Sequence, residues 1–208
     1  MAFIVFEGLD GAGKSTLIRA VSQQLEKLKQ TFVLTREPGG TALGDEIREL
    51  LLRTKGEAPV PRAELLLYQA GRAQHVDCVI QPALKKNQWV LCDRYSASSI
   101  AFQCGGRNIN QAEVEWLNEY STAGLKPDIW ILLDLDADTA KERMQGRELD
   151  RFEKEHRDFH QRVRDSYLKL AKADSKNWLV LSAHDTPAEL EKILLAELRS
   201  RGILKEAQ

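Results

Sequence analysis

The chain has 208 residues, a length that predicts one domain over residues 1–208 with a core large enough to need no disulfide or structural metal. Its 30 basic and 31 acidic side chains leave a net charge of −1, without the positive excess that general nucleic-acid and membrane-surface binders carry. No run approaches the roughly 18 apolar residues of a membrane span, and the three cysteines include no CxxC pair, so we expect reduced thiols and a cytoplasmic protein.

Five short apolar runs alternate with longer stretches of helical periodicity. The runs are Ala2–Phe6, Thr31–Leu34, Trp89–Cys92, Ile129–Leu133 and Trp178–Leu181. The helical stretches are Leu17–Leu28, Ala63–Leu84, Gln111–Ala123, Thr139–Met144, Glu155–Ala173 and Pro187–Arg199. Nearly continuous apolar character is typical of strands covered on both faces. The alternation therefore predicts a three-layer α/β fold, a five-stranded parallel sheet flanked by helices, whose ligands bind beyond the carboxyl ends of the strands.

The first strand runs directly into a glycine-rich segment that fits the pattern GxxxxGK[ST], and an amphipathic helix follows it. Glycines let backbone N–H groups turn toward a phosphate, and the helix adds its positive N-terminal end. Lys14 would reach the β- and γ-phosphates of ATP, and the Ser15 hydroxyl would ligate Mg²⁺. The candidate ATP-binding residues are Gly8, Leu9, Asp10, Gly11, Ala12, Gly13, Lys14, Ser15 and Thr16.

A second anion site is indicated by arginines near strand ends. Arg36 and Arg94 each follow an apolar run at its carboxyl end, and their planar guanidinium groups suit a phosphate dianion. Asp93 ends the same run as Arg94, as a magnesium-organising acid does in P-loop enzymes. A regulatory GTPase would carry an NKxD motif, which the sequence lacks. A small-molecule phosphotransferase is therefore favoured over a nucleotide-binding switch.

At these residues the chain resembles the thymidylate kinase family over essentially its whole length. The shared segments are FEGLDGAGKST (6–16), TREPGG (35–40), the helix segment 68–72, DRYSASSIAFQ (93–103), KPDIWILLDL (126–135) and ELDRFE (148–153). The resemblance implies transfer of a phosphoryl group from Mg-ATP to dTMP, giving dTDP for dTTP synthesis. It also implies a homodimer and a cis Glu37-Pro38 bond. A kinase for another nucleoside monophosphate or a deoxynucleoside is the alternative within the class.

The resemblance also assigns acceptor-binding roles. Asp10 would accept a hydrogen bond from the 3′-hydroxyl of dTMP, and Arg36 and Arg94 would bind its phosphate. Tyr68 would stack on thymine, and Arg72 would reach the thymine O4. The base pocket would be completed by Ser99, Phe102 and Gln103; Phe102 stands where the family commonly has Tyr and would crowd the ribose 2′ position.

The loop interior contains no arginine, so the resemblance points to the subclass whose lid supplies the catalytic cation. The lid is expected at about residues 143–154, where Arg143, Arg147 and Arg151 recur every four residues. Arg147 or Arg151 would act at the transferred phosphate, and Arg143 would pack on the adenine. A solvated helix face with i,i+4 charge pairs is the alternative interpretation.

Overall fold

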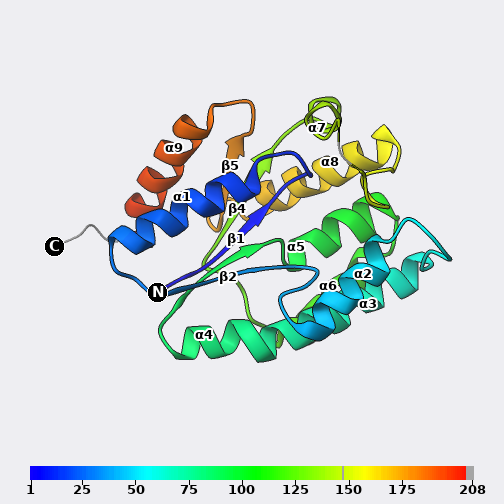
Figure 1. Cartoon of the computed structure of the whole chain (residues 1–208), viewed down its shortest axis with the longest axis horizontal. Helices are drawn as coiled ribbons and strands as arrows, with labels where there is room; N and C mark the ends of the chain where they lie inside the picture. Colours follow the sequence, from blue (N-terminus) through cyan, green and yellow to red (C-terminus); the bar gives the residue numbers. More distant parts are fainter. Residues whose placement is uncertain (147, 205–208) are drawn as a thin grey trace.

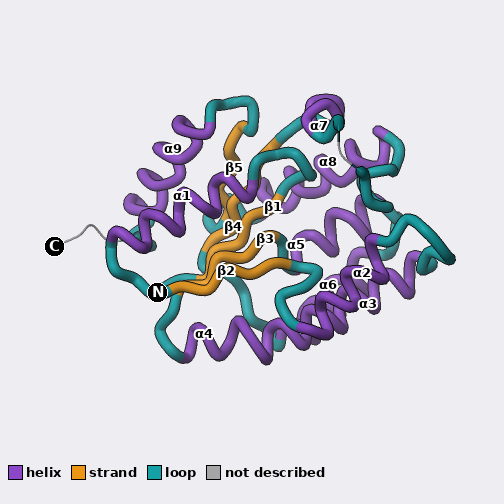
Figure 2. The backbone as a smooth tube through the Cα atoms, in the orientation of Figure 1, coloured by secondary structure: helices purple, strands orange, loops and turns teal. Residues whose placement is uncertain are grey.

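The computed structural model describes residues 1–146 and 148–204. Its centre is a parallel sheet (Figure 1), and the strand order, for which Figure 2 labels every strand, is β2-β3-β1-β4-β5. The strands are β1 (Phe3–Glu7), β2 (Phe32–Arg36), β3 (Trp89–Asp93), β4 (Ile129–Asp134) and β5 (Trp178–Ser182). All five predicted strands are confirmed, each ending one or two residues later than the apolar runs did.

The helices lie on both faces of this sheet, as the three-layer prediction requires (Figure 2). They are α1 (Lys14–Lys27), α2 (Ala42–Leu52), α3 (Pro61–His75), α4 (Gln81–Lys85), α5 (Ser96–Ser99), α6 (Gln111–Thr122), α7 (Ala137–Arg143), α8 (Arg157–Ala173) and α9 (Pro187–Ser200). Two π-helical segments, η1 (Val76–Ile80) and η2 (Ile100–Gly106), join α3 to α4 and continue α5. Among these residues, no helix has the length and apolar character needed to cross a membrane.

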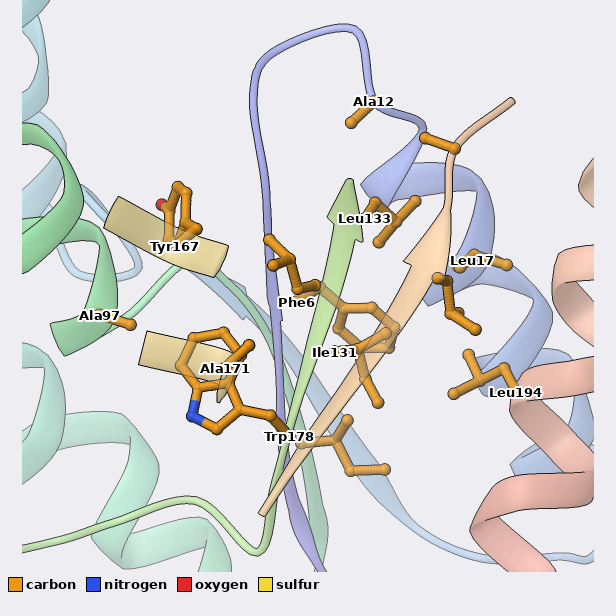
Figure 3. Packing of buried hydrophobic residues seen from close by; sticks show 14 of the residues in the cluster. Phe6, Ala12, Leu17, Ala97, Ile131, Leu133, Tyr167, Ala171, Trp178 and Leu194 are labelled. Atoms are coloured by element: carbon orange, nitrogen blue, oxygen red, sulfur yellow. The ribbon is translucent and has the colours of Figure 1, made fainter. Parts of the chain in front are cut away.

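Alternation along the strands divides the core between the two faces. On β1, Ile4 and Phe6 belong to the larger hydrophobic cluster, whereas Phe3 and Val5 belong to a second cluster on the opposite face. In the larger cluster, side chains of the sheet meet Leu17 of α1 and Leu194 of α9 (Figure 3). Burial on both faces explains why the strands have continuous apolar character.

Two helical regions were missing from the sequence prediction. Helix α2 begins at the Thr41 cap, whose hydroxyl accepts a hydrogen bond from the backbone N–H of Gly44, and it buries Ile47 and Leu51. The second region is α5 with η2, which is helical from Ser96 through Gly106. The other elements agree with their predictions, and Thr186 and Glu189 form a capping box at the start of α9.

Candidate active site

The glycine-rich loop between β1 and α1 holds a buried lysine at its centre. The Nζ of Lys14 donates to the carbonyl oxygens of Gly8 and Leu9, both at 3.2 Å, and the residue is 6 % exposed. Gly8 has a φ of +132°, and a Cβ there would lie 2.4 Å from the carbonyl oxygen of Leu133. Helix α1 starts without a side-chain cap, and Ser15 is exposed in its first turn. The backbone N–H of Thr16 donates to the carbonyl oxygen of Gly13 at 3.1 Å, so among the described residues the N–H groups of Lys14 and Ser15 are left to meet an anion.

Asp93 meets this loop from the end of β3. Its Oδ1 lies 4.0 Å from the Nζ of Lys14 and is buried without a hydrogen-bond partner. An unsatisfied carboxylate oxygen is costly unless a cation or its water shell completes it. Within the described residues, no three His, Cys, Asp or Glu side chains converge on a metal position. Asp93 and Ser15 therefore suit a magnesium ion that takes its other ligands from phosphate and water.

A pocket beside this loop opens at the carboxyl ends of β1, β2 and β3. Polar and apolar side chains converge on it, as they do in small-molecule sites. It is lined by Asp10, Glu37, Pro38, Arg48, Leu52, Tyr68, Arg72, Arg94, Ser98, Ser99, Phe102, Gln103, Asp150 and Phe152. Seven of these are candidates from the sequence: Asp10, Tyr68, Arg72, Arg94, Ser99, Phe102 and Gln103.

Asp10 lies between Lys14 of the glycine-rich loop and Arg94 of the neighbouring pocket. One carboxylate oxygen accepts from the Nη2 of Arg94 at 2.8 Å and lies 3.7 Å from the Nζ of Lys14. Burial acts to raise the pKa of Asp10, but the charges of Arg94 and Lys14 outweigh it and hold this pKa well below its usual range. The carboxylate is thus ionised and joins the two cationic groups across a single gap.

Arg94 is oriented by a buried polar network that the sequence did not reveal. Its Nη1 donates to the hydroxyl of Tyr167 at 3.1 Å, and that hydroxyl donates to Glu7 at 2.7 Å. The Ser98 hydroxyl donates to the same Glu7 oxygen at 2.7 Å. Glu7 is fully buried, and its burial raises its pKa above the usual value despite these donors. The guanidinium of Arg94 also lies 5.1 Å from the ring of Phe102.

The opposite wall of the pocket is aromatic and holds a buried guanidinium. Tyr68 and Phe102 each pack edge-on against Phe152, with ring centroids 6.1 and 5.9 Å apart. Arg72 is 1 % exposed, and its Nη1 donates to the hydroxyl of Ser99 at 2.9 Å. A planar ring between these groups would meet apolar surface on its faces and a cation at its edge.

Arg36 does not lie where the sequence suggested. Its side chain is 57 % exposed, lies 3.8 Å from Asp45, and is absent from the lining of this pocket. The physical reason is strand alternation, which places Arg36 on the same side of edge strand β2 as the exposed Leu34. Arg36 therefore does not line the acceptor pocket, and its contact with the acceptor phosphate stays a prediction.

Arg48 occupies the position expected for Arg36. It lies on α2, lines the pocket, and donates from Nη1 to the carbonyl oxygen of Pro38 at 2.9 Å. Burial lowers the pKa of Arg48, and the neighbouring charge of Arg36 adds to this effect. The sequence contained only a weak sign of this residue's role. Arg48 follows Ile47, and Ile47 and Leu51 form the apolar stripe of a helix that had not been predicted.

The lid arginines have different surroundings. Arg143 ends α7 and donates to the carbonyl oxygens of Gly11, at 3.4 Å, and Ala183, at 2.9 Å. Arg151 donates to the carbonyl oxygen of Leu51 at 2.9 Å and pairs with the buried Glu64 at 2.8 Å, so it does not line the pocket. Arg147 lies outside the described residues. The structure thus brings Arg143 to the glycine-rich loop and holds Arg151 away from it.

The comparisons with known proteins agree with this geometry. A family model described as Thymidylate kinase matches residues 6–193. A thymidylate kinase of Bdellovibrio bacteriovorus is 53 % identical, with 98 % of each chain covered. A thymidylate kinase of Pelobacter propionicus is 41 % identical over 94 % of this chain and 93 % of its own. One from Pelotomaculum thermopropionicum is 46 % identical, with 87 % and 85 % covered.

Proposed function

The chain belongs to the thymidylate kinase family, and we propose that it transfers the terminal phosphoryl group of ATP to the phosphate of dTMP, giving ADP and dTDP. The observation that carries this proposal is the Asp10 carboxylate, held between Lys14 on the donor side and Arg94 on the acceptor side. Two phosphates bound by these cations would meet end to end across one gap. An acceptor phosphate is already anionic, so the transfer needs no dedicated general base.

On the donor side, the backbone N–H groups of the glycine-rich loop and the Nζ of Lys14 would hold the phosphates of ATP. Arg143 lies beside Gly11, where it could pack on the adenine. Ser15 and Asp93 fit a Mg²⁺ ion, Asp93 through water. When bound, the ion neutralises charge on the β- and γ-phosphates.

On the acceptor side, Arg94 and Arg48 would bind the dTMP phosphate. Asp10 would accept a hydrogen bond from the 3′-hydroxyl. Thymine would lie between Tyr68 and Phe102, with its O4 toward Arg72 and with Ser99 and Gln103 at the wall of the pocket. Phe102 would crowd a ribose 2′-hydroxyl. Positioning both substrates is then the main catalytic device, and closing the lid limits hydrolysis of ATP.

Lid cations would stabilise charge on the transferred group. Arg151 is engaged with Glu64, so we assign this task to Arg147 and an anchoring task to Arg151.

An acceptor panel tests the proposed function. ADP release from Mg-ATP would be measured with dTMP, dUMP, CMP, GMP and no acceptor. Rapid release with dTMP, with dUMP about 10–200-fold poorer because it lacks one methyl group, is the expected result. A faster rate with CMP or GMP would favour a different monophosphate kinase. No turnover with any acceptor would favour the nucleotide-binding regulator.

We also propose a homodimer formed through helices α3 and α6. Leu66, Trp116 and Tyr120 are 56, 66 and 77 % exposed, and the two aromatic rings stack with centroids 6.0 Å apart. The adjoining apolar groove is bordered by Arg62 and Glu113. A twofold axis through this face would set the same apolar patch of each copy against that of the other, as an isologous dimer requires.

The three cysteines are unpaired, which supports the proposed cytoplasmic location.

A further inference from the structure

A buried carboxylate in the wall of the acceptor pocket, that of Glu37, joins two side chains. The Oε2 of Glu37 accepts from the Nε of Arg72 at 2.7 Å, and its Oε1 accepts from the Nδ1 of His75 at 2.9 Å. These three residues are 5 %, 1 % and 0 % exposed. His75 is a fully buried residue of α3 that lies outside the pocket lining.

The hydrogen bonds of Arg72 leave it little freedom. The Nε–H donates to Glu37. The two hydrogens of Nη1 are shared among three acceptors, on Gln69, Ser99 and Asn118. Nη2 donates to the carbonyl oxygen of Tyr95 at 3.1 Å, which uses one of its two hydrogens. Among the described residues, these bonds leave one N–H, on Nη2, to meet a ligand.

His75 fixes the other carboxylate oxygen of Glu37, the one that does not contact Arg72. A carboxylate only accepts hydrogen bonds, so the ring carries its hydrogen on Nδ1, while Nε2 lies 2.6 Å from the hydroxyl of Thr35. Gly40, with a φ of +80°, closes over the ring, and a Cβ there would lie 2.8 Å from Nε2. The imidazole is thus fixed by contacts on several sides and cannot turn away from Glu37.

We infer that Glu37 and His75 are positioning residues that fix the guanidinium plane of Arg72 and so determine selection of thymine over cytosine. This inference rests on the proposed function. Thymine presents an acceptor, O4, where cytosine presents an amino donor. A fixed N–H donor binds the first and rejects the second, whereas a guanidinium free to tilt discriminates less.

Two variants of one residue separate the roles of the two ring nitrogens. In His75→Asn the side-chain amide takes the place of Nδ1 and can still donate to Glu37. In His75→Gln the amide reaches the place of Nε2, near Thr35, and leaves the Oε1 of Glu37 without its donor. Both replace the buried ring with an amide, so they make matched perturbations of the packing.

The readout is the ratio of kcat/KM for dTMP to kcat/KM for the 5-methylcytosine analogue, 5-methyl-dCMP. We expect His75→Gln to lower this ratio about tenfold or more, mainly by raising KM for dTMP, and His75→Asn to keep it within about threefold of the unaltered enzyme. A purely structural role would lower both rates together and leave the ratio unchanged. Equal ratios in all three proteins, or equal losses in both variants, would overturn the inference.

Glu37→Gln provides a second route should either histidine variant fail to fold. Its amide can no longer accept from both Arg72 and His75, so the same fall in the ratio is expected, and an unchanged ratio would overturn the inference. Arg72→Met separates the contact that Arg72 itself makes with the base from the positioning role of Glu37 and His75. A fall in the ratio there, with none in the other variants, would refute only the positioning role. An unaltered enzyme that does not use dTMP would refute the proposed function itself.

Discussion

Two arginines near the acceptor pocket show how residue-level prediction depends on orientation. Arg36 has the favoured sequence position, at a strand end, but its guanidinium is 57 % exposed. Arg48 had no strand-end signal, yet it lines the pocket. A strand-end position specifies where a Cα lies, while the face of the strand decides where the side chain goes.

Replacing each arginine in turn tests this reassignment. Arg48→Ala should raise KM for dTMP about 10–100-fold, because a charge-assisted hydrogen bond to phosphate contributes about 1.5–3 kcal/mol. Arg36→Ala is the matched control and should change KM less than about threefold. Steady-state kinetics with dTMP as the varied substrate gives both values. A larger increase in KM for dTMP in Arg36→Ala than in Arg48→Ala would assign the acceptor phosphate to Arg36 instead.

The sequence located Lys14, Asp10 and Arg94 correctly in one cleft, because they follow adjacent parallel strands whose carboxyl ends meet. Tyr167 and Glu7 were missed, although both belong to the network around Arg94. They are 160 positions apart, and nothing local in the sequence indicates that they meet. Buried polar networks of this kind depend on tertiary packing.

At the level of elements, the contacts of Arg151 in the segment that we propose as the lid are those of an anchor. Glu64 of α3 is buried and accepts from Arg151 and Arg107, while the backbone N–H of Arg151 donates to the carbonyl oxygen of Leu52 at 3.3 Å. This segment carries Phe152, which forms part of the pocket wall. Arg151 therefore ties the lid to α2 and α3.

A pair of alanine variants tests this division. Arg147→Ala should lower kcat about 10³-fold with a small change in nucleotide affinity, as expected of a cation at the transferred group. Arg151→Ala should lower the free energy of unfolding by ~1–3 kcal/mol, because Glu64 loses a buried donor, and should lower kcat much less. Single-turnover kinetics and thermal melts measure the two effects. A larger kcat loss in Arg151→Ala would show that this arginine moves to the phosphate.

The cap of α7 gives a pH-dependent prediction. Asp136 accepts from the backbone N–H and the hydroxyl of Thr139, and these bonds lower the pKa of Asp136 to about 2, from an ordinary value of 3.8. A depressed carboxylate pKa stabilises the fold above the unfolded value, and this stability is lost as the pH falls through the folded value. The difference in melting temperature between the unaltered protein and Asp136→Asn should be larger at pH 5 than at pH 2 and should shrink from about pH 4 toward pH 2. A difference that grows on acidification would contradict the assignment.

Elements were predictable where one periodicity ran without interruption. All five strands follow from their apolar runs, and α9 follows from its capping box. Helix α2 was missed because Gly44 and the charged residues around it obscure a stripe of only Ile47 and Leu51. Helical structure through Gly106 was missed because adjacent glycines normally indicate a turn.

At the scale of the whole molecule, the exposed face of α3 and α6 predicts assembly. The unaltered protein should have about twice the mass of one chain in sedimentation equilibrium, and Trp116→Glu should reduce it to that of one chain by placing a charge in the apolar contact. Ile193→Glu, on α9, is a control at a 44 % exposed residue away from this face and should leave the mass unchanged. A monomeric unaltered protein would contradict the proposed dimer.

The central claim is that donor and acceptor phosphates are held by opposing cations on either side of Asp10. A crystal structure with a bisubstrate analogue, in which adenosine and thymidine are joined through one polyphosphate chain, tests it most directly. We expect the chain to run from the glycine-rich loop and Lys14 to Arg94 and Arg48, with thymine against Arg72. A chain that bypasses the gap between Lys14 and Arg94, or that ends on Arg36, would contradict the account.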